Sequence, residues 1–180
     1  MLATAAAYHR ATEKVKQVLD TLQRAGFDQG APMSTFTRDE IDRAFEHYRA
    51  VAKQAGTAND WRAWADLFTE DATYIEHHFG EMHGREAIFE WISTTMKQPI
   101  NDEMTEFPCE WYVIDEDKGW VVCCIQNRMR DPGDGSVHEA PNWTLLKYAG
   151  DNQWSWEEDI YNPNEFTDMI KGWMLAKKDA

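Results

Sequence analysis

Apolar residues in the first part of the chain recur at helical spacing, and turn-forming residues separate the runs. Residues 3–25 form one amphipathic pattern, and residues 27–36 have the composition of a linker. A second helix is predicted from Thr37, because Thr37 and Glu40 have the spacing of a capping box in front of apolar positions. Gly56 is expected to end this helix.

The middle of the chain combines helical and strand patterns, and it predicts helix, strand, turn and helix in that order. Residues 60–68 place apolar side chains at helical spacing. Residues 72–78 are rich in strand-forming residues, so alternate side chains should face opposite sides of a sheet. Gly84 precedes a further helical pattern, which Pro99 stops. One face of the strand is then expected to hold Tyr74, Glu76 and His78.

The second half of the chain changes to the pattern of β-strands. Segments rich in Trp, Tyr, Val and Ile are separated by turn-forming residues, so we expect sequential antiparallel neighbours. The segments are residues 103–114, 119–130, 137–148 and 153–161. Asn162 and Pro163 then start a last helix, with Asn162 as its N-cap. Helices followed by a meander predict an α+β fold, with a bent sheet wrapped around the early helices.

Two short motifs sharpen this expectation: DLFTEDAT at residues 66–73 and HGREAI at residues 83–88. With the pattern around them, they resemble the SnoaL-like, nuclear transport factor 2-like superfamily, which includes ketosteroid isomerases, scytalone dehydratase and limonene epoxide hydrolase. The resemblance covers residues 37–161 and implies a cone of helices and a strongly bent, mostly antiparallel sheet. We therefore expect an N-terminal helical extension and linker at residues 1–36, and the cone domain with its C-terminal helix at residues 37–180.

Charge and composition limit the classes of partner. The chain has 18 Lys and Arg against 32 Asp and Glu, and its net charge of -14 repels nucleic acid and anionic membranes. No apolar run is long enough to span a bilayer, and no secretory leader pattern opens the chain, so we expect a cytoplasmic protein. The cysteines, 3 in number, lack the spacing of a zinc site and are expected to be reduced thiols.

The resemblance to ketosteroid isomerases places functional positions of that family on this chain. Its general-base aspartate aligns at or beside Glu76, and its oxyanion-stabilising tyrosine falls near Tyr48 on the apolar face of a predicted helix. The second oxyanion donor, an aspartic acid in that family, falls at about Thr144, which argues against ordinary ketosteroid isomerisation. The alternatives are a Glu76 that faces solvent and a Tyr48 that only fills the core.

The last predicted strand alternates between an apolar and a polar face. Trp154, Trp156 and Ile160 fall on one side, whereas Asp159 shares the other side with Ser155, Glu157 and Tyr161. A polar face turned to solvent is the ordinary arrangement for an antiparallel sheet. In ketosteroid isomerases the matching positions line the cavity, so the resemblance implies that Asp159 and Tyr161 form an acidic wall.

Further polar and aromatic residues complete the expected site. Two facing carboxylates, Glu76 and Asp159, would share a proton, and His78 lies on the Glu76 face of its strand. The adjacent residues His77 and His78 point to opposite faces, so we expect no metal site. The residues expected to line the cavity are Trp64, Tyr74, Asn127, Thr144, Leu146 and Tyr161.

These residues predict a cofactor-independent enzyme that acts on an apolar, oxygenated small molecule such as a steroid, polyketide or terpenoid. Proton transfer or water activation by Glu76 with Asp159 or His78, and alkoxide stabilisation by Tyr48, fit an isomerase, a dehydratase or a hydrolase. The alternative is a non-catalytic ligand-binding or subunit-assembly domain whose acidic residues face solvent. The superfamily's use of the outer face of its sheet, together with the additional helix expected over residues 3–25, predicts a homodimer or a higher homo-oligomer.

Overall fold

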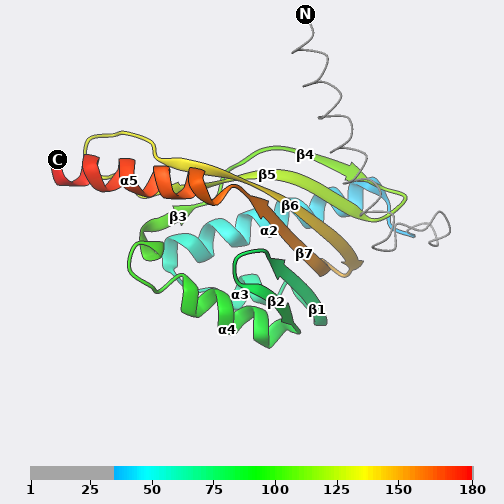
Figure 1. Ribbon diagram of the computed structural model, residues 1–180. Helices are drawn as coiled ribbons and strands as arrows, with labels where there is room; N and C mark the ends of the chain where they lie inside the picture. The colour runs from blue at the N-terminus through cyan, green and yellow to red at the C-terminus, as the bar shows by residue number, and fades with distance from the viewer. Residues whose placement is uncertain (1–34, 180) are drawn as a thin grey trace, which may run out of the picture. The chain divides into compact units, whose positions relative to one another are not determined.

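The first helix of the described chain begins at a side-chain cap. Residues 35–179 are described by a computed structural model (Figure 1), and the helix expected over residues 3–25 lies outside them. Helix α2 (Arg38–Ala58) starts at Thr37, whose hydroxyl accepts a hydrogen bond from the Glu40 backbone N–H at 3.3 Å. The Glu40 carboxylate accepts a hydrogen bond from the Tyr148 hydroxyl at 3.2 Å, which ties the helix start to the sheet.

The prediction that Gly56 ends α2 is wrong. The helix continues to Ala58, and Asn59 caps it in the left-handed conformation with φ of 49°. Gly56 is instead a packing position, because a Cβ there would lie 2.6 Å from the carbonyl oxygen of Thr105 and 2.8 Å from the Phe107 ring. A glycine allows the helix to approach this neighbouring segment, and only the tertiary structure shows that need.

The middle of the chain keeps the predicted order but changes the boundaries. Helix α3 (Arg62–Ala65) is shorter than expected, and β1 (Phe68–Glu76) begins at Phe68 and ends before the histidines. Residues 69–71, which were expected to follow the end of the helix and precede the strand, lie within β1, where its pairing with β7 is irregular. A short strand, β2 (Gly80–His83), was not predicted, whereas α4 (Arg85–Thr95) begins after Gly84 as expected.

The strands of the second half form the meander that the pattern predicts. The elements are η1 (Asn101–Glu103), β3 (Met104–Glu106), β4 (Cys109–Asp115), β5 (Trp120–Met129), β6 (Glu139–Gly150), β7 (Gln153–Tyr161) and α5 (Pro163–Asp179). The strand expected over residues 103–114 is divided around Pro108, and both of its parts pair with β5. The strands β4 to β7 are sequential antiparallel neighbours, as predicted.

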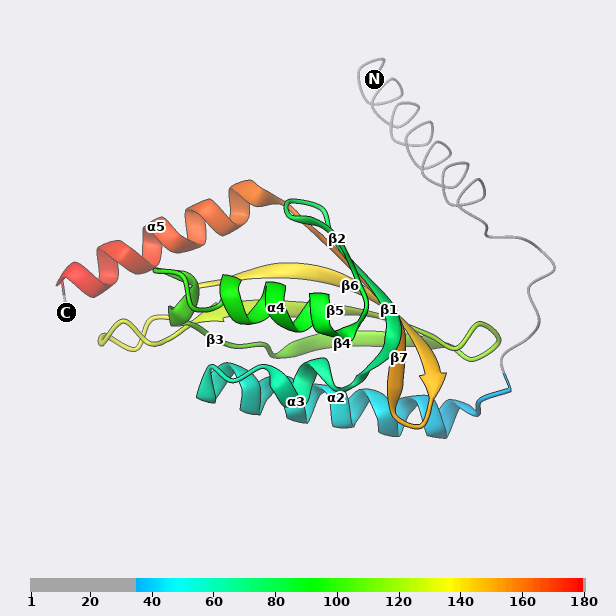
Figure 2. The ribbon, with the colours of Figure 1, turned by 90° about the horizontal axis from the view of Figure 1, so that it is seen from below.

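The sheet is curved and is covered on its concave face by the early helices. Its order is β2-β1-β7-β6-β5-β3, with β4 also paired to β5, and β1 runs parallel to β7. Helices α2, α3 and α4 lie under the curve, and α5 follows β7 and packs against β6 (Figures 1 and 2). The predicted α+β architecture, a strongly bent and mostly antiparallel sheet around N-terminal helices, is confirmed.

An irregularity in β7 changes which of its side chains face inward. Lys147 pairs with Trp156 and Tyr148 pairs with Trp154, so Ser155 is an extra residue, as in a β-bulge. Trp154 is therefore buried, whereas Trp156 is half-buried under the Lys147 ammonium, 4.1 Å from its ring centre. The prediction that Trp154, Trp156 and Ile160 share one face is wrong.

The cysteines and the helices are the features on which composition gave an expectation. Cys109, Cys123 and Cys124 are free thiols, and the latter two are buried. Within residues 35–179, no helix combines the length and the apolar character required to cross a bilayer.

Candidate functional site

The inward side chains of β1, β7 and β6 form rows across the concave face. Strand pairing sets Tyr74 beside Glu157, and in the next row it sets Glu76 beside Asp159. The second row continues through Thr144 on β6. Neighbouring strands are about 4.8 Å apart, so register alone brings the carboxyl groups of a row close together.

All three acidic side chains in these rows are buried. Glu76 is 4% exposed, Glu157 2% and Asp159 8%. Among residues 35–179, no ion pair joins any of them to Lys, Arg or His. Burial of a carboxylate without a cationic partner costs free energy, so a site of this composition points to function.

Hydroxyl groups supply the hydrogen bonds of the two acids on β7. Asp159 accepts from the hydroxyl of Tyr74 and, at 2.6 Å, from the hydroxyl of Thr144. The Tyr48 hydroxyl from α2 lies 2.8 Å and 3.0 Å from the two carboxyl oxygens of Glu157. Tyr48 therefore reaches the site as a partner of Glu157, rather than of Glu76 or Asp159.

Burial shifts the protonation equilibria of these groups. Desolvation raises the pKa of Glu157 well above its ordinary value, and the negative charge of Asp159 raises it further. Desolvation also raises the pKa of Asp159, although hydrogen bonds from Thr144, Tyr74 and Asn142 oppose the rise. The pKa is thus raised at both acids, and the negative charge of Asp159 favours the protonated form of Glu157.

Glu76 lies at the end of β1, where the chain turns toward β2. Its Oε2 atom accepts hydrogen bonds from the backbone N–H groups of His78 and Phe79, at 2.7 Å and 2.6 Å. The pKa of the nearby Tyr161 hydroxyl is raised, first by burial and then by Glu76. His78 itself is exposed, and its ring packs edge-on against Phe79 with the ring centres 5.1 Å apart. The structure thus fixes Glu76 through backbone groups and leaves the imidazole at the rim.

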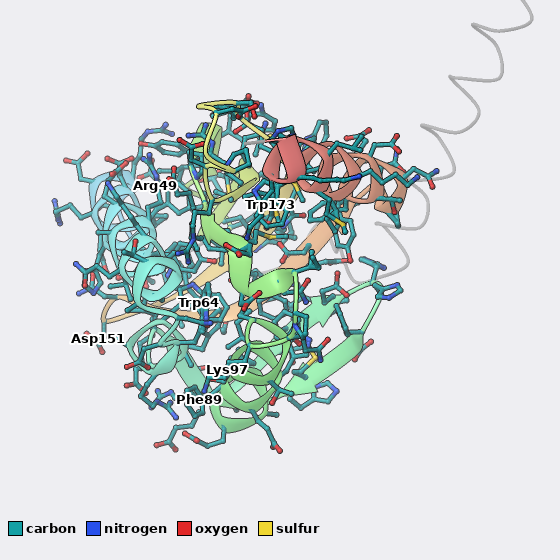
Figure 3. The ribbon with its side chains drawn as sticks, turned by 90° about the vertical axis from the view of Figure 1, so that its left-hand side faces the viewer. Arg49, Trp64, Phe89, Lys97, Asp151 and Trp173 are labelled. Carbon is teal, nitrogen blue, oxygen red and sulfur yellow. The ribbon has the colours of Figure 1, made fainter. Side chains whose placement is uncertain are left out.

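These residues line a pocket of about 410 Å³ between the sheet and the helices. Trp64 on α3 lies between α2 and α4, where its ring contributes to the wall (Figure 3). The wall is largely aromatic, because it also includes Trp61, Phe79, Trp91, Phe107 and Phe166. A concave, mostly apolar space with a few convergent polar groups is the usual form of a small-molecule site.

The pocket brings together most of the residues singled out from the sequence. Glu76, Asp159, Tyr48 and His78 all contribute to its lining. Those expected at the wall and found there are Trp64, Tyr74, Asn127, Thr144 and Tyr161. Leu146 differs, because it pairs with Glu157 in the sheet but is completely buried in the core and is absent from the lining.

Glu157 is the residue that sequence reasoning missed. Its alternation with Asp159 placed it on the same polar face, so the signal was present. An isolated polar face on a strand is most often turned to solvent, and no aligned family position singled out Glu157. Its partner Tyr48 is 109 residues away in the sequence, which hides the contact from any local pattern.

This arrangement is suited to proton transfer. A buried carboxyl group with a raised pKa can donate a proton near neutral pH, and a neighbouring carboxylate can accept one. Glu157 and Asp159 lie two residues apart on one strand and face the same pocket, so both can reach one bound molecule. Tyr48, Tyr74 and Thr144 hold these acids in place through hydrogen bonds.

Comparison with known protein families supports the fold described above. A family model described as the SnoaL-like domain matches residues 35–176, which include every strand and almost the whole of α5. A search of curated proteins finds no significant match to the chain. The family assignment therefore rests on the domain model, and solved structures add evidence on the fold.

Solved structures with this fold come from several proteins of different kinds. A protein of ketosteroid isomerase-like fold from Catenulispora acidiphila, solved with trimethylamine, is 22% identical, with a TM-score of 0.55 over 75% of this chain and 95% of that one. An epoxide hydrolase from M. tuberculosis is 13% identical, with a TM-score of 0.56 and coverages of 77% and 94%. A putative SnoaL-like polyketide cyclase from Jannaschia sp. is 15% identical, with a TM-score of 0.56 and coverages of 81% and 97%. At these identities the likeness shows the fold alone.

Proposed function

The chain belongs to the SnoaL-like domain family, and we propose that it is a cofactor-independent enzyme that transfers protons on a small, mainly apolar, oxygenated molecule. One observation supports this most strongly: Glu157 and Asp159 are buried at the wall of one pocket, and no cationic side chain of residues 35–179 pairs with them. Acid–base catalysis in an apolar cavity needs carboxyl groups whose pKa is raised by desolvation. In this proposal the side chains described above supply the acid and the base, and a hydrolysis would in addition consume one water molecule.

Glu157 is the proposed general acid and Asp159 the proposed general base. The pKa of Glu157 is raised the more strongly of the two, and the charge on Asp159 is one of its causes, so Asp159 loses its proton first. An ionised Asp159 beside a protonated Glu157 offers an acceptor and a donor to the same substrate. This extends the pair of acids expected from the sequence, in which Glu76 was the partner of Asp159.

Glu76, Tyr48 and His78 have supporting parts in this proposal. Glu76 adds a further acceptor one strand away from Asp159, fixed by its backbone hydrogen bonds. Tyr48 orients Glu157 through the hydrogen bond that its hydroxyl donates to the carboxyl group. The same hydroxyl can stabilise a developing alkoxide only if it turns this hydrogen bond from Glu157 to the substrate oxygen. His78, exposed at the rim, is placed to contact the entering substrate.

The substrate class follows from the size and lining of the pocket. A volume of about 410 Å³ with an aromatic wall suits a molecule the size of a steroid, polyketide or terpenoid unit. Isomerisation, dehydration and epoxide hydrolysis can all use an acid and a base that face one substrate. The family includes proteins named for cyclase and hydrolase activities, which is consistent with this range.

Turnover of a substrate panel tests the proposal. Purified protein would be given an unsaturated ketosteroid, a cyclic terpene epoxide and a β-hydroxy ketone, with product detected by mass spectrometry. We expect turnover of at least one compound, a loss of at least about a hundredfold in Glu157→Gln and Asp159→Asn, and unchanged turnover in Glu158→Gln. Glu158 lies between the two acids on β7 but pairs with His77 on the other face, so it is a matched control. Tight binding of these compounds without turnover would favour the non-catalytic alternative.

Self-association through the convex face is proposed as well. Trp111, Cys124, Trp143 and Ile160 lie in one row across β4, β5, β6 and β7. Trp111 is 41% exposed, and Trp143 and Ile160 are each 58% exposed. A row of large apolar side chains at the surface is typical of a protein interface. The expected assembly is a homodimer, and sedimentation measures it directly.

A further inference from the structure

The acidic wall of the pocket has no cation to balance it among residues 35–179. Arg49 and His78 are the basic residues of the lining. The Arg49 guanidinium pairs with Glu46 at 2.7 Å and lies over the Phe45 ring, while the His78 side chain is exposed. The buried acids accept hydrogen bonds from hydroxyl, amide and backbone groups, all of them uncharged. Positive charge is therefore the missing component of the site.

Asn142 holds an acceptor without a donor in the wall of the same pocket. The single hydroxyl proton of Thr144 is donated to Asp159 at 2.6 Å, so toward Asn142 this hydroxyl can only accept. The amide nitrogen of Asn142 donates to it at 3.3 Å, which leaves Oδ1 without a donor among the described residues. Asn142 is 7% exposed and lines the pocket. A buried acceptor without a donor costs free energy, and a ligand N–H would satisfy it.

Aromatic rings that line the same pocket are also suited to a cation. Trp91 lies between Tyr74 and Phe79, with ring centres 4.8 Å and 6.0 Å away, and all three rings line the pocket. The faces of such rings attract ammonium groups, with Trp the strongest. The indole N–H of Trp91 has no acceptor among the described residues.

We propose that the pocket selects an organic ammonium ion: an apolar molecule whose protonated amine points its N–H groups at Asp159, Glu76 and the Asn142 carbonyl oxygen. This inference rests on the proposed function, because it names the substrate class of the same pocket. A metal ion is the other cation to consider, but no group of three His, Cys, Asp or Glu side chains within residues 35–179 has metal-ligating geometry. The substrate would then carry both this amine and the oxygen function of the proposed reaction.

Matched ligands test the assignment on the full chain. Calorimetry would compare benzylamine, which has charge and N–H groups, with benzyltrimethylammonium, which has charge alone, and with benzyl alcohol, which is neutral. We expect benzylamine to bind at least about tenfold more tightly than benzyl alcohol, with benzyltrimethylammonium between them. The preference should disappear in the double variant Glu76→Gln, Asp159→Asn and persist in Glu158→Gln. Retained binding of benzyl alcohol shows that the double variant is folded.

The outcomes separate this inference from the proposed function. Equal affinity for benzylamine and benzyl alcohol overturns the ammonium assignment, as does a preference that survives in the double variant. Turnover of the neutral panel would still support acid–base catalysis in that case. An ammonium preference without turnover of any amine or neutral compound supports the assignment and overturns the enzyme proposal. Failure of all three ligands to bind overturns the ammonium assignment.

Discussion

The protonated state of Glu157 has a consequence for stability that needs no substrate to test. Glu157 is 2% exposed, and desolvation and the Asp159 charge both raise its pKa in the folded protein. In the unfolded chain its pKa returns to about 4.3. At a pH between the pKa of Glu157 in the unfolded chain and its pKa in the folded protein, the unfolded chain has lost the carboxyl proton and the folded protein keeps it. Folding then takes up a proton, so the free energy of unfolding falls as pH rises.

The size of this effect follows from linkage. A single retained proton lowers the free energy of unfolding by about 1.4 kcal/mol for each pH unit, or about 2.7 kcal/mol over two units. Below the unfolded pKa both states are protonated and the full stability is present, and above the folded pKa the loss stops. Glu157→Gln removes the titration but keeps an oxygen for the Tyr48 hydroxyl, so the relative stability of the variant should increase with pH.

Urea denaturation at several values between about pH 5 and pH 8 measures this difference. Any cost of the new amide group is the same at each pH, so the slope rather than the offset carries the information. Glu158→Gln, on the outer face of the same strand, should follow the wild-type slope. A Glu157→Gln variant with the wild-type slope would refute a raised pKa at Glu157 and, with it, the general-acid role.

Three further predictions concern the surroundings of the site, the packing and the surface. Tyr74→Phe removes a donor that lowers the pKa of Asp159, so that pKa should rise in carboxyl NMR titrations, whereas Tyr112→Phe, which loses its bond to Asp42, should leave it unchanged. Gly56→Ala places a Cβ 2.6 Å from the Thr105 carbonyl oxygen and should cost about 1–3 kcal/mol in urea denaturation; an unchanged midpoint would contradict the packing argument. Trp143→Glu should convert the dimer to a monomer in sedimentation experiments, whereas Val137→Glu, at an exposed position outside the apolar row of the convex face, should leave the dimer intact. A wild-type protein that sediments as a monomer at micromolar concentration would contradict the dimer.

Sequence patterns predicted the helix starts because a helix start is determined by residues that are close together in the sequence. The cap at Thr37 and the last helix after Asn162 depend on contacts within a few residues, and both are found. Gly56 was misread because its role depends on the approach of residues 104–107, far along the chain. The order of helices and meander predicted the bent sheet, and the resemblance carried by the family motifs implied the same architecture.

The candidate site was predictable as a polar face but not as a set of contacts. Alternation along β7 placed Glu157 and Asp159 together, yet whether that face is the inside depends on the bulge at Ser155 and the parallel pairing with β1. The same irregularity explains why Trp154 lies in the interior and not on the face that it was expected to share with Trp156. Tyr48 was found through its helix face, while its bond to Glu157 required the complete fold.

The most direct test of the central claim is a carbon-13 NMR titration of the side-chain carboxyl groups. The account predicts signals from Glu157 and Asp159 that titrate above the ordinary carboxyl range of about 4, with Glu157 the higher. Glu157→Gln should remove the higher titration, and Asp159→Asn should remove the lower and bring the higher down. Ordinary values for both acids in the wild-type protein would contradict a proton-transfer pair in this pocket.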